Sequence, residues 1–200
     1  ATTVLGDFTG GNVVDEVNSV TVRLYDSDDT LASITRAELL SDGGAVLIGN
    51  EVLLVQRWTL VAAQTYKGTG LLRGRKGTEQ HMSTHAVNDR FWVLTPANVY
   101  RVSQQLAEVG DAYYKGVASG TAVVDAATQE FENTAAALKP LSPVHLARAA
   151  ISGGYALQWV RRTRVGGVWA NGTDAPLGES SEQYRVRVLD GATVIESQTV

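Results

Sequence analysis

Residues 45–72 read AVLIGNEVLLVQRWTLVAAQTYKGTGLL, and this stretch decides the fold class. Its apolar residues come in short runs rich in Val and Leu, and turn-forming Gly and Asn interrupt them before a helix-length segment builds up. The stretch therefore predicts an all-β protein. The four strands expected within it are Ala45–Ile48, Glu51–Gln56, Trp58–Gln64 and Tyr66–Leu72, the first two joined about Gly49-Asn50.

The same pattern continues on both sides of this stretch. Apolar and polar residues alternate over 20–25, and a compact apolar run fills Arg90–Thr95. Short strands with Gly-rich turns favour a barrel-like β domain over residues 1–138. Further strands are expected at Val99–Val102, Ala112–Ala118 and Gln129–Asn133, and one or two helical turns at Ser103–Val109.

Two prolines mark a domain boundary at Lys139-Pro140-Leu141-Ser142-Pro143, because they force extended backbone and interrupt strand pairing. Residues 1–139 carry a net charge of −5, whereas residues 140–200 carry +1. Asp190-Gly191 is a hairpin signal. The strands expected beyond the boundary lie at about 144–150, 155–164, 183–189 and 193–200, with Arg161–Arg164 as the end of the second.

Composition excludes several classes of function. The chain has 200 residues with 17 Lys+Arg against 21 Asp+Glu, a net charge of −4 that argues against broad nucleic-acid binding. The absence of cysteine excludes disulfides, thiol catalysis and cysteine-based zinc sites. No apolar run approaches the roughly 18 residues that a membrane span needs.

Two clusters invite a ligand interpretation. Glycines interleave with Lys67, Arg73, Arg75 and Lys76, as in a phosphate-binding loop, but the spacing is not that of a P-loop. A structured loop is favoured, with its arginines paired to carboxylates such as Glu51, Glu79 or Asp89. His81 and His85 lie four apart near Glu79, but no helical pattern and no further ligand supports a metal site. His145, beside the proline boundary, is expected to be structural.

No catalytic residue and no cofactor are predicted. The N-terminal carboxylates lie in polar, turn-like stretches where such groups are usually solvated: Asp7, Asp15, Glu16, Asp26, Asp28 and Asp29. Of the tryptophans, Trp58, Trp92 and Trp159 lie in apolar strands where core packing is the default. Trp169, in a Gly-rich loop, is the one expected to be exposed.

One signature resembles a known family. Residues 66–79, YKGTGLLRGRKGTE, are followed by His85 and then by DRFWVL at 89–94. This order of a Leu-Leu-Arg-Gly-Arg-x-Gly-Thr turn, a His and an apolar strand is similar to the large tail-tip (baseplate hub) proteins of siphophages and of phage-like gene transfer agents. PLSPVHL at 140–146 and WVRRTR at 159–164 fit the same family. The signature residues are Leu71, Leu72, Arg73, Gly74, Arg75, Gly77, Thr78 and His85.

The resemblance implies an architectural role and no enzymatic activity. It implies a structural protein of the virion, made in the host cytoplasm, that takes part in tail assembly and host attachment. The implied partners are the distal tail and hub proteins, further copies of the chain in a symmetric trimer, and a host surface receptor. The alternatives are a carbohydrate- or receptor-binding β module and, with less support, a glycan hydrolase.

Residues 139–200 would then open a fibronectin type III-like domain. A sandwich of the related immunoglobulin type takes about seven strands and roughly 100 residues, and these residues supply about four strands. We therefore expect a partial sandwich with an uncovered apolar face, and a chain that is a piece of a longer protein.

Overall fold

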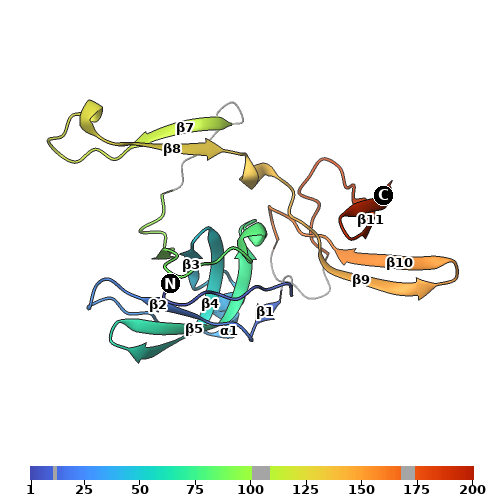
Figure 1. Cartoon of the computed structure of the whole chain (residues 1–200), viewed down its shortest axis with the longest axis horizontal. Helices are drawn as coiled ribbons and strands as arrows, with labels where there is room; N and C mark the ends of the chain where they lie inside the picture. The colour runs from blue at the N-terminus through green and yellow to red at the C-terminus, as the bar shows by residue number, and fades with distance from the viewer. Residues whose placement is uncertain (11–12, 101–108, 168–173) are drawn as a thin grey trace. The chain divides into compact units, whose positions relative to one another are not determined.

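The computed structural model describes all residues except 11–12, 101–108 and 168–173. Its compact units are Ala1–Lys139 and Pro140–Val200 (Figure 1). The prediction of an all-β fold is confirmed, since the α-helix within the described residues is the short α1 (Arg36–Leu40). The strands are β1 (Val14–Asp15), β2 (Val20–Arg23), β3 (Ala45–Ile48), β4 (Glu51–Ala62), β5 (Thr65–Arg75), β6 (Phe91–Val93), β7 (Gly110–Lys115), β8 (Thr128–Asn133), β9 (Val144–Ile151), β10 (Gly154–Val160), β11 (Arg185–Asp190) and β12 (Thr193–Thr199).

Six of these strands form one antiparallel sheet in the first unit. Its order is β1-β5-β4-β3-β6, with β2 also paired to β5. A tight turn joins β3 to β4, and Gly49 takes a positive φ of 57° there, which glycine adopts without steric cost. β4 and β5 then run together as one long hairpin that forms the centre of the sheet.

Both faces of the central hairpin are covered. One face buries a large apolar cluster that includes Leu53, Val55 and Leu71. The other face buries Leu54 and Leu72 against Leu39 of α1. Because successive strand residues point to opposite faces, the Leu71-Leu72 pair supplies one side chain to each cluster.

Side-chain hydrogen bonds cap the N-terminus of the short helix α1. Thr35 accepts a hydrogen bond from the backbone N–H of Glu38, and the Glu38 carboxylate accepts one from the backbone N–H of Thr35. This capping box satisfies donors that the first turn would otherwise leave free. The cap thereby positions Leu39 for its contact with the second face of the sheet.

The barrel-like form expected for this unit is wrong in one respect, because the sheet stays open. β1 and β2 both pair with β5, at different points along its length, and the three-residue β6 ends the opposite edge. Closure needs hydrogen bonds between the first and last strands, and none joins them among the described residues. The downstream strands β7 and β8 pair with each other as a separate hairpin.

The described residues of the second unit contain four strands in two hairpins. β9 pairs with β10 and β11 with β12, each antiparallel. The hairpin predicted at Asp190-Gly191 is confirmed, with Gly191 at a positive φ of 56°. The T-shaped contact of Trp159 with Tyr184, at 4.9 Å between ring centroids, joins the two hairpins. The assignment of this unit to the fibronectin type III class stays a prediction.

Three strand predictions differ from the structure. The two strands expected at Glu51–Gln56 and Trp58–Gln64 form one continuous strand, β4, because Arg57 stays in the ladder opposite Thr69. β10 ends at Val160, because Arg161 is drawn into bonds with Asp174, the Ala175 carbonyl and Glu182 rather than into the ladder. Val99 follows a turn in which its N–H donates to the Thr95 carbonyl, so no strand begins there. Residues 101–102 of that expected strand, and most of the expected helical turns at 103–109, lie outside the described residues. Within those described, no helix has the length and apolarity to cross a membrane.

Candidate structural site: a buried ionic cluster

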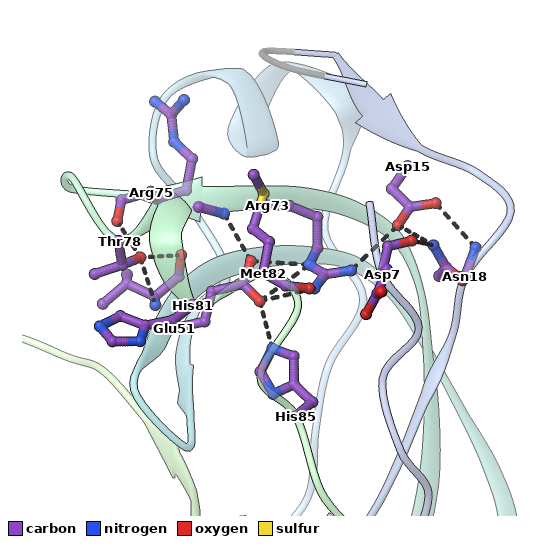
Figure 2. Close-up of polar contacts among 12 residues, drawn as sticks. Asp7, Asp15, Asn18, Glu51, Arg73, Arg75, Thr78, His81, Met82 and His85 are labelled. Atoms are coloured by element: carbon purple, nitrogen blue, oxygen red, sulfur yellow. Dashed lines mark hydrogen bonds and ion pairs between the residues drawn. The ribbon is translucent and has the colours of Figure 1, made fainter. Parts of the chain in front are cut away.

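The signature residues surround an arginine at the end of β5. The side chain of Arg73 is fully buried, and so are the carboxylates of Glu51 and Asp15 that face it (Figure 2). Glu51 stands at the start of β4, directly after the Gly49-Asn50 turn. The central hairpin of the sheet therefore places the arginine and its main partner side by side.

Every nitrogen of the Arg73 guanidinium has an acceptor. Nε donates to both oxygens of Glu51, at 2.8 and 3.1 Å. Nη2 donates to Glu51 Oε2 at 2.9 Å and to the Met82 carbonyl at 3.0 Å. Nη1 donates to the Gly6 carbonyl at 3.0 Å and lies 3.4 Å from Asp15 Oδ2. A lysine, with its single ammonium nitrogen, has no planar fork to match this set.

Glu51 accepts two further hydrogen bonds. The backbone N–H of Gly74 donates to Oε1 at 2.7 Å, and His85 Nε2 lies 2.6 Å from Oε2. Burial by itself raises the pKa of Glu51, but the hydrogen bonds from His85, Arg73 and Gly74 outweigh burial and hold that pKa below its usual value. The carboxylate is thus kept ionised at the centre of the cluster.

Asp15 closes the other side of the guanidinium. Its Oδ1 accepts hydrogen bonds from the backbone N–H groups of Val17 and Asn18, and its Oδ2 accepts one from Asn18 Nδ2 at 2.8 Å. This is an Asx-type turn, in which a side chain satisfies the backbone that follows it. The turn fixes the carboxylate before it meets Arg73.

His85 lies between two carboxylates. Its Nε2 faces Glu51 (Figure 2). Its Nδ1 lies 3.0 Å from Asp89 Oδ2. The hydrogen bond with Glu51 raises the pKa of His85 above its usual value; burial opposes this, and Asp89 adds to it. Asp89 also accepts the backbone N–H of Ala86, which is the main reason that the pKa of Asp89 is lowered.

The glycine after Arg73 is required by close packing. Gly74 takes a φ of +57°, and a Cβ there would lie 2.9 Å from Glu79 Cγ and 3.0 Å from Glu79 Cα. Both the backbone conformation and the contact disfavour a larger residue. Gly77 also has a positive φ, of 82°.

The other signature residues hold the turn after β5. Thr78 Oγ1 accepts a hydrogen bond from the Val52 N–H at 3.0 Å and donates one to the Arg75 carbonyl at 2.7 Å. Arg75 Nη2 lies 3.4 Å from Asp42 Oδ1, and Lys76 Nζ lies 2.5 Å from the other oxygen of that carboxylate. These contacts tie the turn to β4 and to the segment that links α1 to β3.

The arrangement serves structure better than chemistry. The donors of Arg73 and the acceptors of Glu51 are used within the cluster, so neither group faces a ligand. Among the described residues no group of three or more His, Cys, Asp or Glu is placed to hold a metal ion. The ring of His85 contacts two carboxylates. This differs from the pair of metal ligands that the four-residue spacing between His81 and His85 allowed.

The candidate carboxylates are dispersed. Asp15 is buried in the cluster, whereas Glu16 pairs on the surface with Arg36 and Arg57. Asp26, Asp28 and Asp29 are exposed. The sequence identified Glu51 and Asp89 as carboxylates near the loop but missed Asp15, for which the turn-forming run Asp15–Asn18 was the available signal. The carbonyls of Gly6 and Met82 carried no signal, because any residue supplies a carbonyl.

The tryptophans divide between core and surface. Trp58 packs edge-on against Phe91 beside the main apolar cluster, as expected. Trp92 is 58% exposed on the edge strand β6, so the expectation that it packs in the core is wrong. Trp159 is half-buried. Trp169 lies outside the described residues.

The second unit has a groove of about 690 Å³ between its two hairpins. Its apolar lining comes from both, with Leu146, Leu157 and Trp159 on one side and Tyr184 and Val186 on the other. Arginine and glutamine side chains add polar groups: Arg148, Gln158, Gln183 and Arg185.

Comparison with known proteins gives one similarity. The model of a family described as Rcc01698-like, C-terminal, matches residues 1–92. The match includes every charged member of the buried cluster and ends within β6. No curated protein and no solved structure matches the chain.

Proposed function

We propose that this chain is a structural component of a phage tail tip, within the baseplate hub, where it supports tail assembly and host attachment. The observation that carries the proposal is the inward orientation of the polar signature. The guanidinium of Arg73 donates its hydrogen bonds to Glu51, Asp15 and two backbone carbonyls of its own unit. Such a signature supports a rigid module, and a catalytic site instead needs a perturbed acid or base beside a substrate cavity.

The partners in this proposal are other tail proteins. The distal tail and hub proteins would flank the chain in the virion, and copies of the chain would close around a symmetry axis as a trimer. The exposed apolar side chains of the hairpins are consistent with burial in such an assembly; they include Tyr113 and Phe131 of β7 and β8 and Leu146 and Tyr155 of β9 and β10.

The test is the composition of the native assembly. A purification tag placed on the natural protein in its source organism should recover distal tail and hub proteins, identified by mass spectrometry. The mass of the intact complex should correspond to three copies. Recovery of the protein alone, or with partners unrelated to tails, would contradict the tail-tip assignment; one copy per tail would contradict the trimer.

A second candidate is binding of a carbohydrate or another receptor, and the groove of the second unit favours it. Aromatic rings beside uncharged amides and arginines are suited to sugar rings and hydroxyl groups. Titration of the full chain with host cell-wall saccharides, followed by Trp159 NMR signals, tests this. Chemical-shift changes of Trp159 and Tyr184 that follow the same dependence on saccharide concentration would support binding in the groove. Unchanged signals at saturating saccharide would exclude it.

A further inference from the structure

The segment between β5 and β6 is held to the sheet by side-chain contacts, one of which is made by His85. Residues 76–90, which we name the strap, contain a single 3₁₀ turn, η1 (Glu79–His81), and otherwise no regular structure among the described residues. Side chains anchor the strap to the sheet at three points. Thr78 bonds to Val52, the Met82 carbonyl accepts from Arg73, and His85 contacts Glu51.

The His85 contact differs from the other two because it depends on a proton. A neutral imidazole has one N–H donor and one bare nitrogen, whereas the imidazolium cation has two donors. Both ring nitrogens of His85 face carboxylate oxygens, at 2.6 Å to Glu51 and 3.0 Å to Asp89. A neutral ring would turn a lone pair toward one of these oxygens, which repels rather than binds.

We propose that His85 is a proton lock, which fastens the strap to the sheet as the imidazolium cation and loosens it when the ring loses its proton. The geometry that carries this is a nearly buried ring, 2% exposed, between carboxylates from two segments of the chain. Glu51 belongs to β4, and Asp89 belongs to the strap itself. Deprotonation therefore breaks a link between the sheet and the strap.

The charges around the ring account for the direction of the effect. Glu51 from β4 and Asp89 from the strap favour the cation, and Arg73 from β5 opposes it. Beyond these, Asp15 faces the far side of Arg73, and the α-amino group of Ala1 donates to the Asp89 carbonyl. Two carboxylates in direct contact outweigh one guanidinium, whose charge is already matched by Glu51 and Asp15.

The raised pKa of His85 sets the direction in which attachment of the strap depends on pH. The pKa of His85 is raised above its ordinary value of 6.5, so the stabilisation is complete below that value and is lost as pH rises through the folded-state pKa. At low pH the lock fails for a different reason, as protons reach Glu51, whose pKa is lowered. The strap is held between these two limits, and on the alkaline side the loss of the His85 proton breaks its link to Glu51.

The first experiment reads the proton directly. Nitrogen-15 NMR of the full chain, recorded across a pH titration, should show both ring nitrogens of His85 protonated below a titration midpoint that lies above 6.5. A midpoint at or below 6.5 would overturn the proposal, and this result does not depend on any variant folding.

The second experiment measures how firmly the strap is held to the sheet. Amide exchange of Ala86, whose N–H donates to Asp89, should lose about tenfold protection, after correction for intrinsic rates, as pH passes the His85 midpoint. Amides of β4 and β5 should keep their protection. In His85→Gln the step with pH should vanish, whereas His145→Gln should retain it. Constant protection of the strap across the midpoint in the natural sequence would overturn the lock.

Discussion

The six-stranded sheet and the Pro140–Val200 unit use similar residues to different effect. The sheet buries twelve apolar side chains together with Asp15, Glu51 and Arg73, whereas no described residue of the second unit is buried. Both regions contain alternating apolar strands. The difference is that β4 and β5 have neighbours on both edges and covered faces, while each hairpin of the second unit consists of two strands. A two-stranded hairpin is marginally stable by itself in water.

The contrast indicates that the sheet supplies stability and that the second unit offers surface for interaction. In the sheet, the apolar clusters and the ionic cluster hold a self-sufficient core. In the second unit, exposed side chains such as Leu146, at 74%, and Tyr155, at 63%, retain most of their contact with water. Apolar surface of this kind gains by burial against another chain or segment.

Arg73→Ala should be the most destabilising substitution. It leaves Asp15 buried without a counter-charge and Glu51 with His85 alone, and breaking a buried pair in this way costs about 3–5 kcal/mol. The free energy of unfolding, measured by urea denaturation, provides the test. Arg57→Ala is the matched control, because Arg57 pairs with Glu16 on the surface and should change stability by less than about 1 kcal/mol. Equal stability of both variants would show that the cluster does not hold the sheet.

The same apolar truncation should have unequal effects in the two regions. Leu53→Ala removes a fully buried side chain and should cost about 2–5 kcal/mol. Leu157→Ala removes one that is 48% exposed and should cost about 1 kcal/mol or less. Urea denaturation of both variants compares them directly. A Leu157→Ala cost as large as that of Leu53→Ala would mean that the second unit has a core of its own.

Gly74→Ala should destabilise the sheet by about 1–3 kcal/mol, because a residue with a Cβ is strained at positive φ and this Cβ meets Glu79. The control is Gly116→Ala, since a Cβ at Gly116 has no heavy atom within 4 Å. Thermal denaturation of the pair measures the difference. If both glycines tolerate alanine equally, the turn after β5 is looser than the contacts indicate.

Thr35→Ala should have the smallest of these effects, about 1 kcal/mol, through loss of the cap of α1. The loss should weaken the cover that Leu39 provides over Leu54 and Leu72. Amide exchange of the helix reads this locally, and Thr30→Ala, in an exposed segment, is the control. An unchanged exchange rate at Leu39 would mean that apolar contact alone holds the helix.

The sequence by itself determined the class of fold and much of its layout. Period-two alternation placed β2, and short apolar runs between turn residues placed β3 and most of the central hairpin, although they divided β4 in two. The two prolines fall where the chain divides. The Leu-Leu-Arg-Gly-Arg signature indicated a structured loop with Glu51, Glu79 or Asp89 as partners, because a rigid arginine among glycines is typical of fixed ion pairing. Of these three, Glu51 is the carboxylate that Arg73 contacts. These are local signals, and local physics is enough to read them.

Only the tertiary structure decided how the strands close and which groups meet Arg73. The sheet stays open because β1 and β2 both pair with β5, at different points along its length. Alternation does not determine which strand edge another strand joins. Asp15 lies 58 residues from Arg73, and Gly6 and Met82 contribute carbonyls that every residue possesses. The state of His85 likewise follows from two carboxylates placed on either side of its ring, because a charge is set by what surrounds it in space and not by its neighbours along the chain.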